Sequence, residues 1–169
     1  MILRFWEQSH EPKTNGNWKR LRLWKLDLRG AYTLLSFRPE GAGLFGMELT
    51  DDLIYLQICG IFGWSSTPAA FQVVTRSFKW EFKSRLKSNT EMYVDDVIGV
   101  CFAEDVVSDV VEAARICTSL LGPTAIALEK TETDTRLEII GYVVDLDIMR
   151  VSIARKNFMK LKTMQKLAS

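Results

Sequence analysis

Two adjacent carboxylates stand where the surrounding sequence is apolar. Asp95 and Asp96 lie between the apolar runs at residues 92–94 and 97–100. Two-residue hairpin turns favour Asn-Gly, Asp-Gly or Gly-X because they require positive φ, so Asp-Asp is a poor choice for a turn. Adjacent carboxylates also repel each other, and a hard divalent cation with oxygen ligands relieves that repulsion. The pair therefore favours a Mg²⁺ site.

A third carboxylate has a comparable setting. Asp27 ends the otherwise apolar and basic segment LRLWKLDL at residues 21–28. Two divalent ions about 3.5–4 Å apart can activate an attacking oxygen and stabilise a leaving phosphate, provided that carboxylates offset their charge. Taken singly, a solvated turn and an ordinary strand end are the simpler interpretations. The hypothesis of a two-metal site therefore depends on the combination.

Several elements must position these acids. Alternation predicts a strand over 21–28 that ends at Asp27, and hairpins at 43–59, around Asp95-Asp96, and at 136–153 with its turn at 145–147. Helices are predicted over 68–86, with Ser66 or Thr67 as N-cap, and over 104–121. A short basic helix closes the chain, with Phe158, Leu161 and Met164 on one face. This order predicts an α+β fold with helices packed on one face of an antiparallel sheet.

Composition sets broad limits. A length of 169 residues, 47% of them hydrophobic and 25% charged, suits one soluble globular domain. Three cysteines without a CxxC pair are interpreted as buried, reduced thiols, which favours an intracellular protein. No apolar run reaches membrane-spanning length, so no membrane partner is expected. Both ends are basic and residues 89–112 are acidic. This distribution suits a polyanion with a metal, but charge alone favours the simpler interpretation of solvated surface faces.

Five motifs in order resemble the palm of a reverse transcriptase of retrotransposon or retroviral type. They are LDLRGAYTLLSF at 26–37, GWSSTPAAFQ at 63–72, YVDD at 93–96, LEKTE at 128–132 and IIGYVVDLD at 139–147. The resemblance covers roughly residues 21–153. It implies a ferredoxin-like antiparallel sheet and templated deoxynucleotide addition to a primer 3′-hydroxyl, by a two-metal mechanism.

The resemblance also implies residue roles. Asp27, Asp95 and Asp96 would be catalytic and hold two Mg²⁺ ions, which Mn²⁺ can replace, together with the Leu28 carbonyl. The residues implied in nucleotide binding are Arg29, Gly30, Ala31, Tyr32, Phe62, Gly63 and Lys130. Those implied in primer or template binding are Trp64, Ser65, Pro68, Gln72, Tyr93, Gly141 and Tyr142.

Some of these roles have open alternatives. Tyr32 would stack under the sugar and exclude a 2′-hydroxyl, or it is a core aromatic residue. Lys130 would neutralise the leaving pyrophosphate, or it is a solvated lysine. The amides of residues 29–31 would lie near the triphosphate.

The chain departs from the family pattern at two points. Ile61-Phe62 stands where such enzymes usually carry Pro-Gln, which puts a nucleotide contact in doubt. Only 26 residues precede Asp27, so we expect one palm domain over 1–169, with a fingers remnant at 1–20 and the start of a thumb at 154–169. Expected partners are a primed RNA or DNA template, deoxynucleoside triphosphates and the rest of a retroelement polyprotein. The alternative is a degenerate or repurposed palm that binds nucleic acid or protein without catalysis; a nucleotide cyclase on a similar palm is disfavoured by GWSSTPAAFQ.

Overall fold

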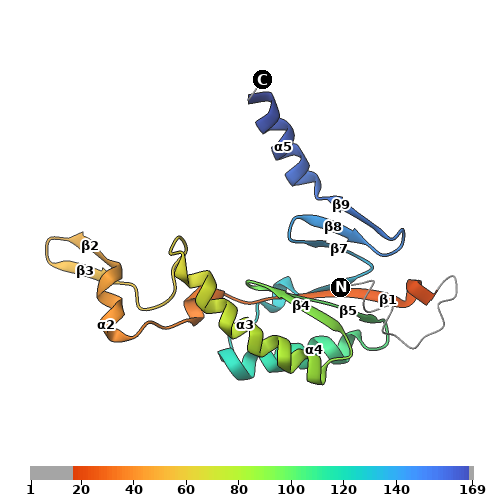
Figure 1. Ribbon diagram of the computed structural model, residues 1–169, viewed down its shortest axis with the longest axis horizontal. Coiled ribbons are helices and arrows are strands. Elements are labelled where there is room, and N and C mark those ends of the chain that lie inside the picture. The colour runs from red at the N-terminus through yellow and green to blue at the C-terminus, as the bar shows by residue number, and fades with distance from the viewer. Residues whose placement is uncertain (1–16, 168–169) are drawn as a thin grey trace.

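The computed structural model describes residues 17–167, and the fold is α+β as predicted (Figure 1). Most of the predicted fingers remnant, residues 1–16, lies outside the described residues. The larger elements are β1 (Leu21–Asp27), β2 (Gly46–Thr50), β3 (Leu53–Leu56), α3 (Ser66–Arg85), β4 (Asn89–Tyr93), β5 (Asp96–Phe102), α4 (Val106–Leu121), β6 (Glu132–Asp134), β7 (Arg136–Ile139), β8 (Tyr142–Asp145), β9 (Arg150–Ile153) and α5 (Arg155–Leu167). Short turns of helix are η1 (Asn17–Arg20), η2 (Ala31–Leu34), α2 (Pro39–Ala42), η3 (Gly43–Phe45) and η4 (Leu128–Lys130).

The central sheet has the strand order β4-β5-β1-β6, and every neighbouring pair is antiparallel. Because the chain runs β1-α3-β4-β5-α4-β6, the sheet has the predicted ferredoxin-like connectivity. Helices α3 and α4 lie together on one face, and the separate sheet β7-β8-β9 lies on the other (Figure 1). The prediction that the helices pack on one face is confirmed.

Alternation along β1 builds a core on each face. Leu21 and Leu23 pack with Val100, Leu137 and Leu146 beneath the second sheet. The intervening side chains Trp24 and Leu26, followed by Leu28, belong to the helix-side core. They pack there with Phe71, Phe78 and Phe82 of α3, and all six are nearly inaccessible. Successive side chains of a strand point to opposite faces, so the odd-numbered set also carries Asp27 onto the face away from the helices.

A buried polar link fixes the helix-side core. Trp24 lies across from Gly99 in the β1–β5 register, and a Cβ at position 99 would overlap the indole ring. The indole N–H donates to Ser88 Oγ at 2.9 Å, and the Ser88 hydroxyl donates to the Asp109 carboxylate on α4. Asp109 is only 3% exposed and also accepts the Ser88 amide at 2.6 Å. Sheet and helix layer are therefore joined by hydrogen bonds as well as by apolar contact.

Several predicted boundaries are corrected. The hairpin turn is Val94-Asp95 rather than Asp95-Asp96, because Tyr93 pairs with Asp96. Helix α3 begins at Ser66 with Ser65 as N-cap, so Pro68 is its third residue. Residues 136–153 form three strands rather than two, and β6 was not predicted at all.

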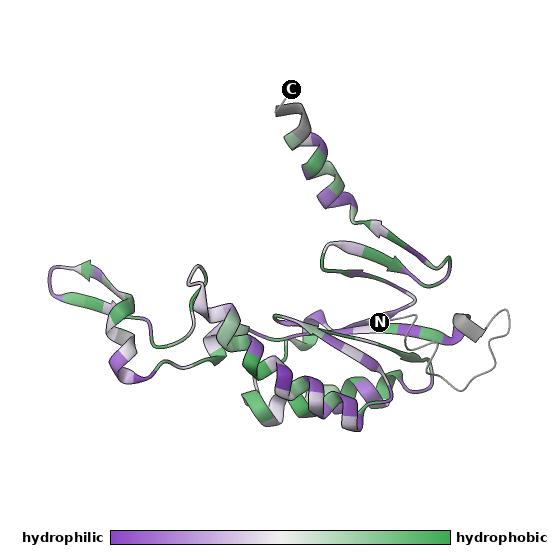
Figure 2. Ribbon diagram, in the orientation of Figure 1, coloured by the Kyte–Doolittle hydropathy of each residue, from purple (hydrophilic) through white to green (hydrophobic). Residues whose placement is uncertain are grey.

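Two elements have little cover. All residues of β2 and β3 are exposed, and the hairpin projects from one end of the molecule (Figure 1) with apolar residues along both strands (Figure 2). Helix α5 extends from the end of β9 away from the α3–α4 layer (Figure 1), and its predicted apolar face is exposed at Phe158, Leu161 and Met164. Among the helices of residues 17–167, none combines the length and apolar character needed to cross a membrane.

Candidate active site

The β4–β5 loop holds a strained residue beside the carboxylates. Val94 has φ of 53°, a conformation that a β-branched side chain rarely adopts. The neighbouring Asp95 carbonyl accepts the Leu28 amide at 2.8 Å, which fixes the loop against the end of β1. Strain of this kind persists only where surrounding contacts hold it, and it concentrates at functional sites.

The β1–β5 register brings two carboxylates together. Asp27 lies directly across from Asp96, where antiparallel partners have Cβ atoms about 4.5–5.5 Å apart. Burial raises the pKa of Asp96, and the charges of Asp95 and then Asp27 raise it further. Like charges on opposed positions destabilise a sheet. The fold therefore holds the Asp96 carboxylate where its anionic form is costly.

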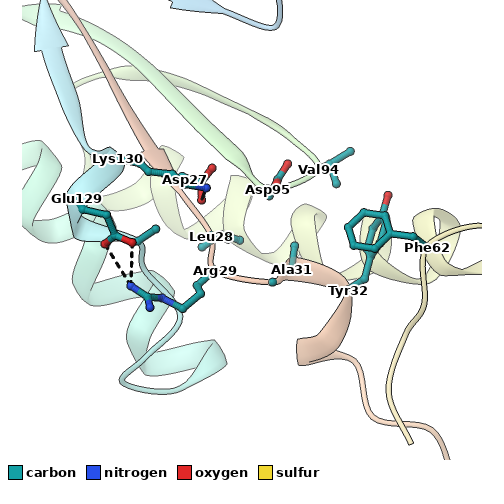
Figure 3. Close-up of a pocket in the computed structure, with 12 residues that line it drawn as sticks. Asp27, Leu28, Arg29, Ala31, Tyr32, Phe62, Val94, Asp95, Glu129 and Lys130 are labelled. Atoms are coloured by element: carbon teal, nitrogen blue, oxygen red, sulfur yellow. Dashed lines mark hydrogen bonds and ion pairs between the residues drawn. The ribbon is translucent and has the colours of Figure 1, made fainter. Parts of the chain in front are cut away.

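Asp27 and Asp95 both line a pocket of about 250 Å³, and Figure 3 shows them at its centre, from β1 and the β4–β5 loop. Seven of the other lining residues were predicted as metal or nucleotide contacts: Leu28, Arg29, Gly30, Ala31, Tyr32, Phe62 and Lys130. Residues far apart in the chain thus converge on one concave surface.

Two ion pairs close one wall of this pocket. Lys130 Nζ lies 3.0 Å from Asp27 Oδ1, and this hydrogen bond raises the pKa of Lys130 (Figure 3). Arg29 donates to both Glu129 oxygens at 3.1 Å. The Arg29 amide donates to the Ala125 carbonyl at 2.7 Å. This amide is therefore not available to a phosphate, contrary to the prediction.

The donor chemistry fits a hard divalent cation. Carboxylate oxygens are the ligands that Mg²⁺ prefers, and Asp27 and Asp95 present them to the same pocket. Within residues 17–167, however, no three His, Cys, Asp or Glu side chains are grouped closely enough to hold a metal ion. Lys130 neutralises Asp27 instead, so a cation entering here has to replace its ammonium group.

Tyr32 separates the pocket of Asp27 and Asp95 from a larger groove. Its ring centroid lies 5.0 Å from that of Phe62 and 6.0 Å from that of buried Phe71. A Cβ at Gly60 would lie 2.5 Å from the Tyr32 carbonyl oxygen, so only glycine fits there. Phe62 is 80% exposed and its aromatic face is open to a ligand. The Tyr32 ring is therefore held from several sides.

The groove has a volume of about 530 Å³ and lies between α3 and the β4–β5 hairpin. Tyr32 and Val94 line both the groove and the pocket of Asp27 and Asp95, so the two adjoin. Four residues predicted to contact primer or template line the groove: Ser65, Pro68, Gln72 and Tyr93.

Other predicted residues lie elsewhere. Trp64 packs on Phe37 and Phe45, with ring centroids 5.3 and 5.1 Å away, rather than in the groove. Gly141 and Tyr142 line a third pocket beneath α5, where the Asn157 side chain donates to the Gly141 carbonyl at 3.2 Å.

Asp96 and Gly63 do not line the pocket of Asp27 and Asp95 either. Gly63 has φ of 93° and open space where a Cβ would stand, so it serves the turn before α3. Lining residues that sequence reasoning missed are Val94, Ala127 and Glu129. Glu129 adjoins Lys130 in LEKTE, and its charge was the available signal.

The strand order and the paired carboxylates define a polymerase-palm-like α+β domain. Solved structures with this fold include the foamy viral protease-reverse transcriptase in complex with RNA/DNA hybrid, with a TM-score of 0.63 and 12% identity. The dRH form with ds DNA gives a TM-score of 0.68 at 11% identity, and a further complex with dsDNA gives 0.62 at 12%. At such low identity the likeness concerns the fold alone.

Each match covers 83% of this chain, but only 18%, 24% and 28% of the respective viral chains. The chain thus spans less than a third of those proteins. No family model matches the sequence, and no curated protein matches it.

Proposed function

We propose that this chain is the palm of a retroelement reverse transcriptase, which transfers deoxynucleotides to a primer 3′-hydroxyl on an RNA or DNA template. The observation that carries the proposal is a pair of opposed carboxylates, Asp27 and Asp96, at one sheet end, with Asp95 beside them in the strained β4–β5 loop. Such a costly arrangement is best explained by a cationic ligand that offsets it. The fold likeness to viral reverse transcriptases supports this choice among metal-dependent reactions.

The residues that line the pocket would have distinct roles in this reaction. Asp27 and Asp95, with the Leu28 carbonyl, would hold two Mg²⁺ ions, or Mn²⁺ in their place. When bound, these ions supply charge compensation for the attacking and leaving oxygens. The rings of Phe62 and Tyr32, whose centroids lie 5.0 Å apart, form an aromatic wall that suits the sugar and base of an incoming nucleotide. A ribose 2′-hydroxyl would then meet the Tyr32 ring.

Lys130 would change partners during this reaction. Its ammonium neutralises Asp27 without nucleotide and is 60% exposed, so it is free to swing toward solvent. Released from Asp27, it would lie at the pocket wall where a pyrophosphate leaves, with Arg29 held close by Glu129. The hydrogen bond to Asp27 raises the pKa of Lys130, so the group is cationic when the exchange begins.

A second candidate function is a palm that binds nucleic acid or a protein partner without catalysis. The Lys130–Asp27 ion pair favours it, because this pair neutralises the first carboxylate without a metal. The apolar side chain of Phe62, where the family carries glutamine, also weakens nucleotide binding. The two candidates differ in one observable, metal-dependent primer extension.

The test is primer extension in Mg²⁺ or Mn²⁺ by this chain alone and by the chain joined to the fingers of a related element. We expect little extension by the chain alone, because a primer end that is not held in line gains no advantage from metal ligands. The joined chain should extend the primer. Asp27→Asn and Asp95→Asn should each reduce extension by more than about 100-fold, since each removes several kcal/mol of charge stabilisation.

Asp52→Asn, in the exposed turn of the β2–β3 hairpin, is the matched control and should leave extension unchanged. Extension that survives Asp27→Asn would refute the metal assignment. A joined chain that folds, binds the duplex and extends nothing would favour the non-catalytic candidate.

A further inference from the structure

One face of α3 carries three basic side chains. Arg76, Lys79 and Lys83 follow one another at spacings of three and four residues, which places them along one side of the helix. All three are exposed. We call them the basic stripe. None was assigned a role from the sequence motifs, because they lie beyond GWSSTPAAFQ.

The basic stripe continues the groove that adjoins the catalytic pocket. Arg76 and Lys79 line the groove together with Gln72 one turn earlier. Across from them stand Tyr93 and Val94 of the β4–β5 hairpin. Because Val94 also lines the pocket of the carboxylates, the groove leads from Asp27 and Asp95 along α3.

The charges of the stripe are available to a ligand. Within residues 17–167, the side chains of Arg76 and Lys83 take part in no hydrogen bond or ion pair. Lys79 pairs with Glu91 at 2.5 Å, but both side chains are about half exposed, so the pair contributes little and can be exchanged. Glu81, the acid nearest on α3, is bound to Arg85 at 2.9 Å instead.

The spacing suits a polynucleotide backbone. A rise of about 1.5 Å per residue places Arg76 and Lys83 about 10 Å apart along the helix axis. One strand advances about 3.4 Å per nucleotide, so the stripe faces about three successive phosphates. Tyr93 on the opposite wall is 56% exposed and offers a ring to sugar or base.

We propose that the basic stripe binds the phosphodiester backbone of the nucleic-acid strand that runs out of the catalytic pocket along α3. This inference rests on the proposed function and adds to it a contact that fixes the direction of the strand. Free phosphate or a single nucleotide would meet only one of the three cations. The ligand class is therefore a polynucleotide strand rather than a small anion.

The test is fluorescence anisotropy with a labelled primer–template duplex carrying a single-stranded overhang, in EDTA, over a range of salt concentrations. The chain is compared with the triple variant Arg76→Gln, Lys79→Gln, Lys83→Gln. Each phosphate contact contributes about 0.7–0.9 to the magnitude of the slope of log association constant against log salt concentration. The slope of the variant should therefore be smaller in magnitude by about 2–3. Its Kd at low salt should rise by at least 10-fold, an effect on the order of 1.4 kcal/mol.

A second triple variant controls for net charge. Arg85→Gln, Lys87→Gln and Arg115→Gln remove three cations that are already paired with Glu81, Glu112 or Asp105 outside the groove. This variant should keep most of the slope. Thermal unfolding of both variants should stay close to that of the parent, because all six positions are exposed.

Asp27→Asn separates this inference from the proposed function. It should keep the anisotropy signal while losing extension in the joined chain. Equal slopes for the parent and the stripe variant would overturn the basic stripe and leave the proposed function standing. Duplex binding by the joined chain without extension would overturn catalysis alone. Absence of duplex binding by the parent chain and the joined chain would overturn both proposals.

Discussion

The central sheet and the β2–β3 hairpin use similar residues under opposite conditions. In β1 and β5, Leu23 and Val100 are fully buried between two covering layers. In the hairpin, Leu53 and Ile54 are 55% and 65% exposed. A two-stranded hairpin is marginal by itself in water, and apolar side chains on both of its faces require a cover. Within residues 17–167 no element supplies this cover.

The residue pattern of a strand and its contribution to stability are therefore separate properties. The sheet derives its stability from cores on both faces, and it can therefore hold opposed carboxylates at one end. The hairpin has the pairing of a sheet but no core, so its side chains contribute little to the free energy of unfolding. Substitutions should divide sharply between the two regions.

The largest effect is expected at Gly99. Gly99→Ala places a methyl group against the fully buried Trp24, whose ring has no room to move. We expect a loss of about 3 kcal/mol or more in the free energy of unfolding, as for severe overpacking. Urea unfolding followed by tryptophan fluorescence measures it. Gly41→Ala is the control, since its Cβ would meet nothing within 4 Å; equal stability of the two variants would contradict the packing described.

The next effect is expected at Asp109. Asp109→Ala removes the acceptor of the Ser88 amide and hydroxyl and leaves both donor hydrogens buried without an acceptor. The cost should be about 1–3 kcal/mol. Asp52→Ala, in the exposed hairpin turn, should stay within about 0.5 kcal/mol. If Asp109→Ala costs no more than Asp52→Ala in the same urea titration, the buried link has no stabilising role.

A smaller effect of opposite sign is expected at Asp96. Asp96→Asn removes a negative charge from across Asp27 and should stabilise the metal-free protein by about 0.2–1 kcal/mol. It should also reduce the rise in Tm that Mg²⁺ or Mn²⁺ causes, because a ligand that binds only the folded state stabilises it. Differential scanning calorimetry with and without metal measures both. Loss of stability without metal would show that the opposed carboxylates are not strained.

The smallest effect is expected in the hairpin. Ile54→Ser should change the free energy of unfolding by less than about 0.5 kcal/mol, because the side chain is exposed. It should increase solubility, measured by light scattering against protein concentration. Val100→Ser, at a fully buried site, should cost several times more. An equal cost at both positions would mean that the hairpin is covered after all.

Strong periodicity made most of the fold predictable. Helix α3 was predicted within two residues because Phe71, Val74, Phe78 and Phe82 recur on one face, and α4 ends at Gly122 as predicted. The errors fall where backbone conformation overrides side-chain pattern. Ile140 and Gly141 both adopt positive φ within an apparently continuous apolar run, so the run splits into β7 and β8.

The candidate site was predictable in its residues and less so in its geometry. Asp27 and Asp95 could be selected because carboxylates interrupt apolar strands. The sequence could not predict that Val94 rather than Asp96 completes the turn with Asp95. Valine is a poor residue for positive φ, and tertiary contacts impose this conformation on it. The Lys130–Asp27 pair joins residues 103 apart, and no local pattern encodes such a contact.

The pairing of β1 also dictates an order of events during synthesis. Its partners are β5 at residues 96–102 and β6 at residues 132–134, whereas the β4–β5 and β7–β8–β9 pairings are local. At roughly 5–20 residues per second, a ribosome needs several seconds to deliver β5 after β1 has emerged. During that interval the apolar residues of β1 have no strand to pair with. Pairing is further delayed after β5 has emerged, because contacts between residues far apart in the chain form slowly. Strand β1 is therefore synthesised before the other strands of the central sheet but is among the last of them to form its pairings.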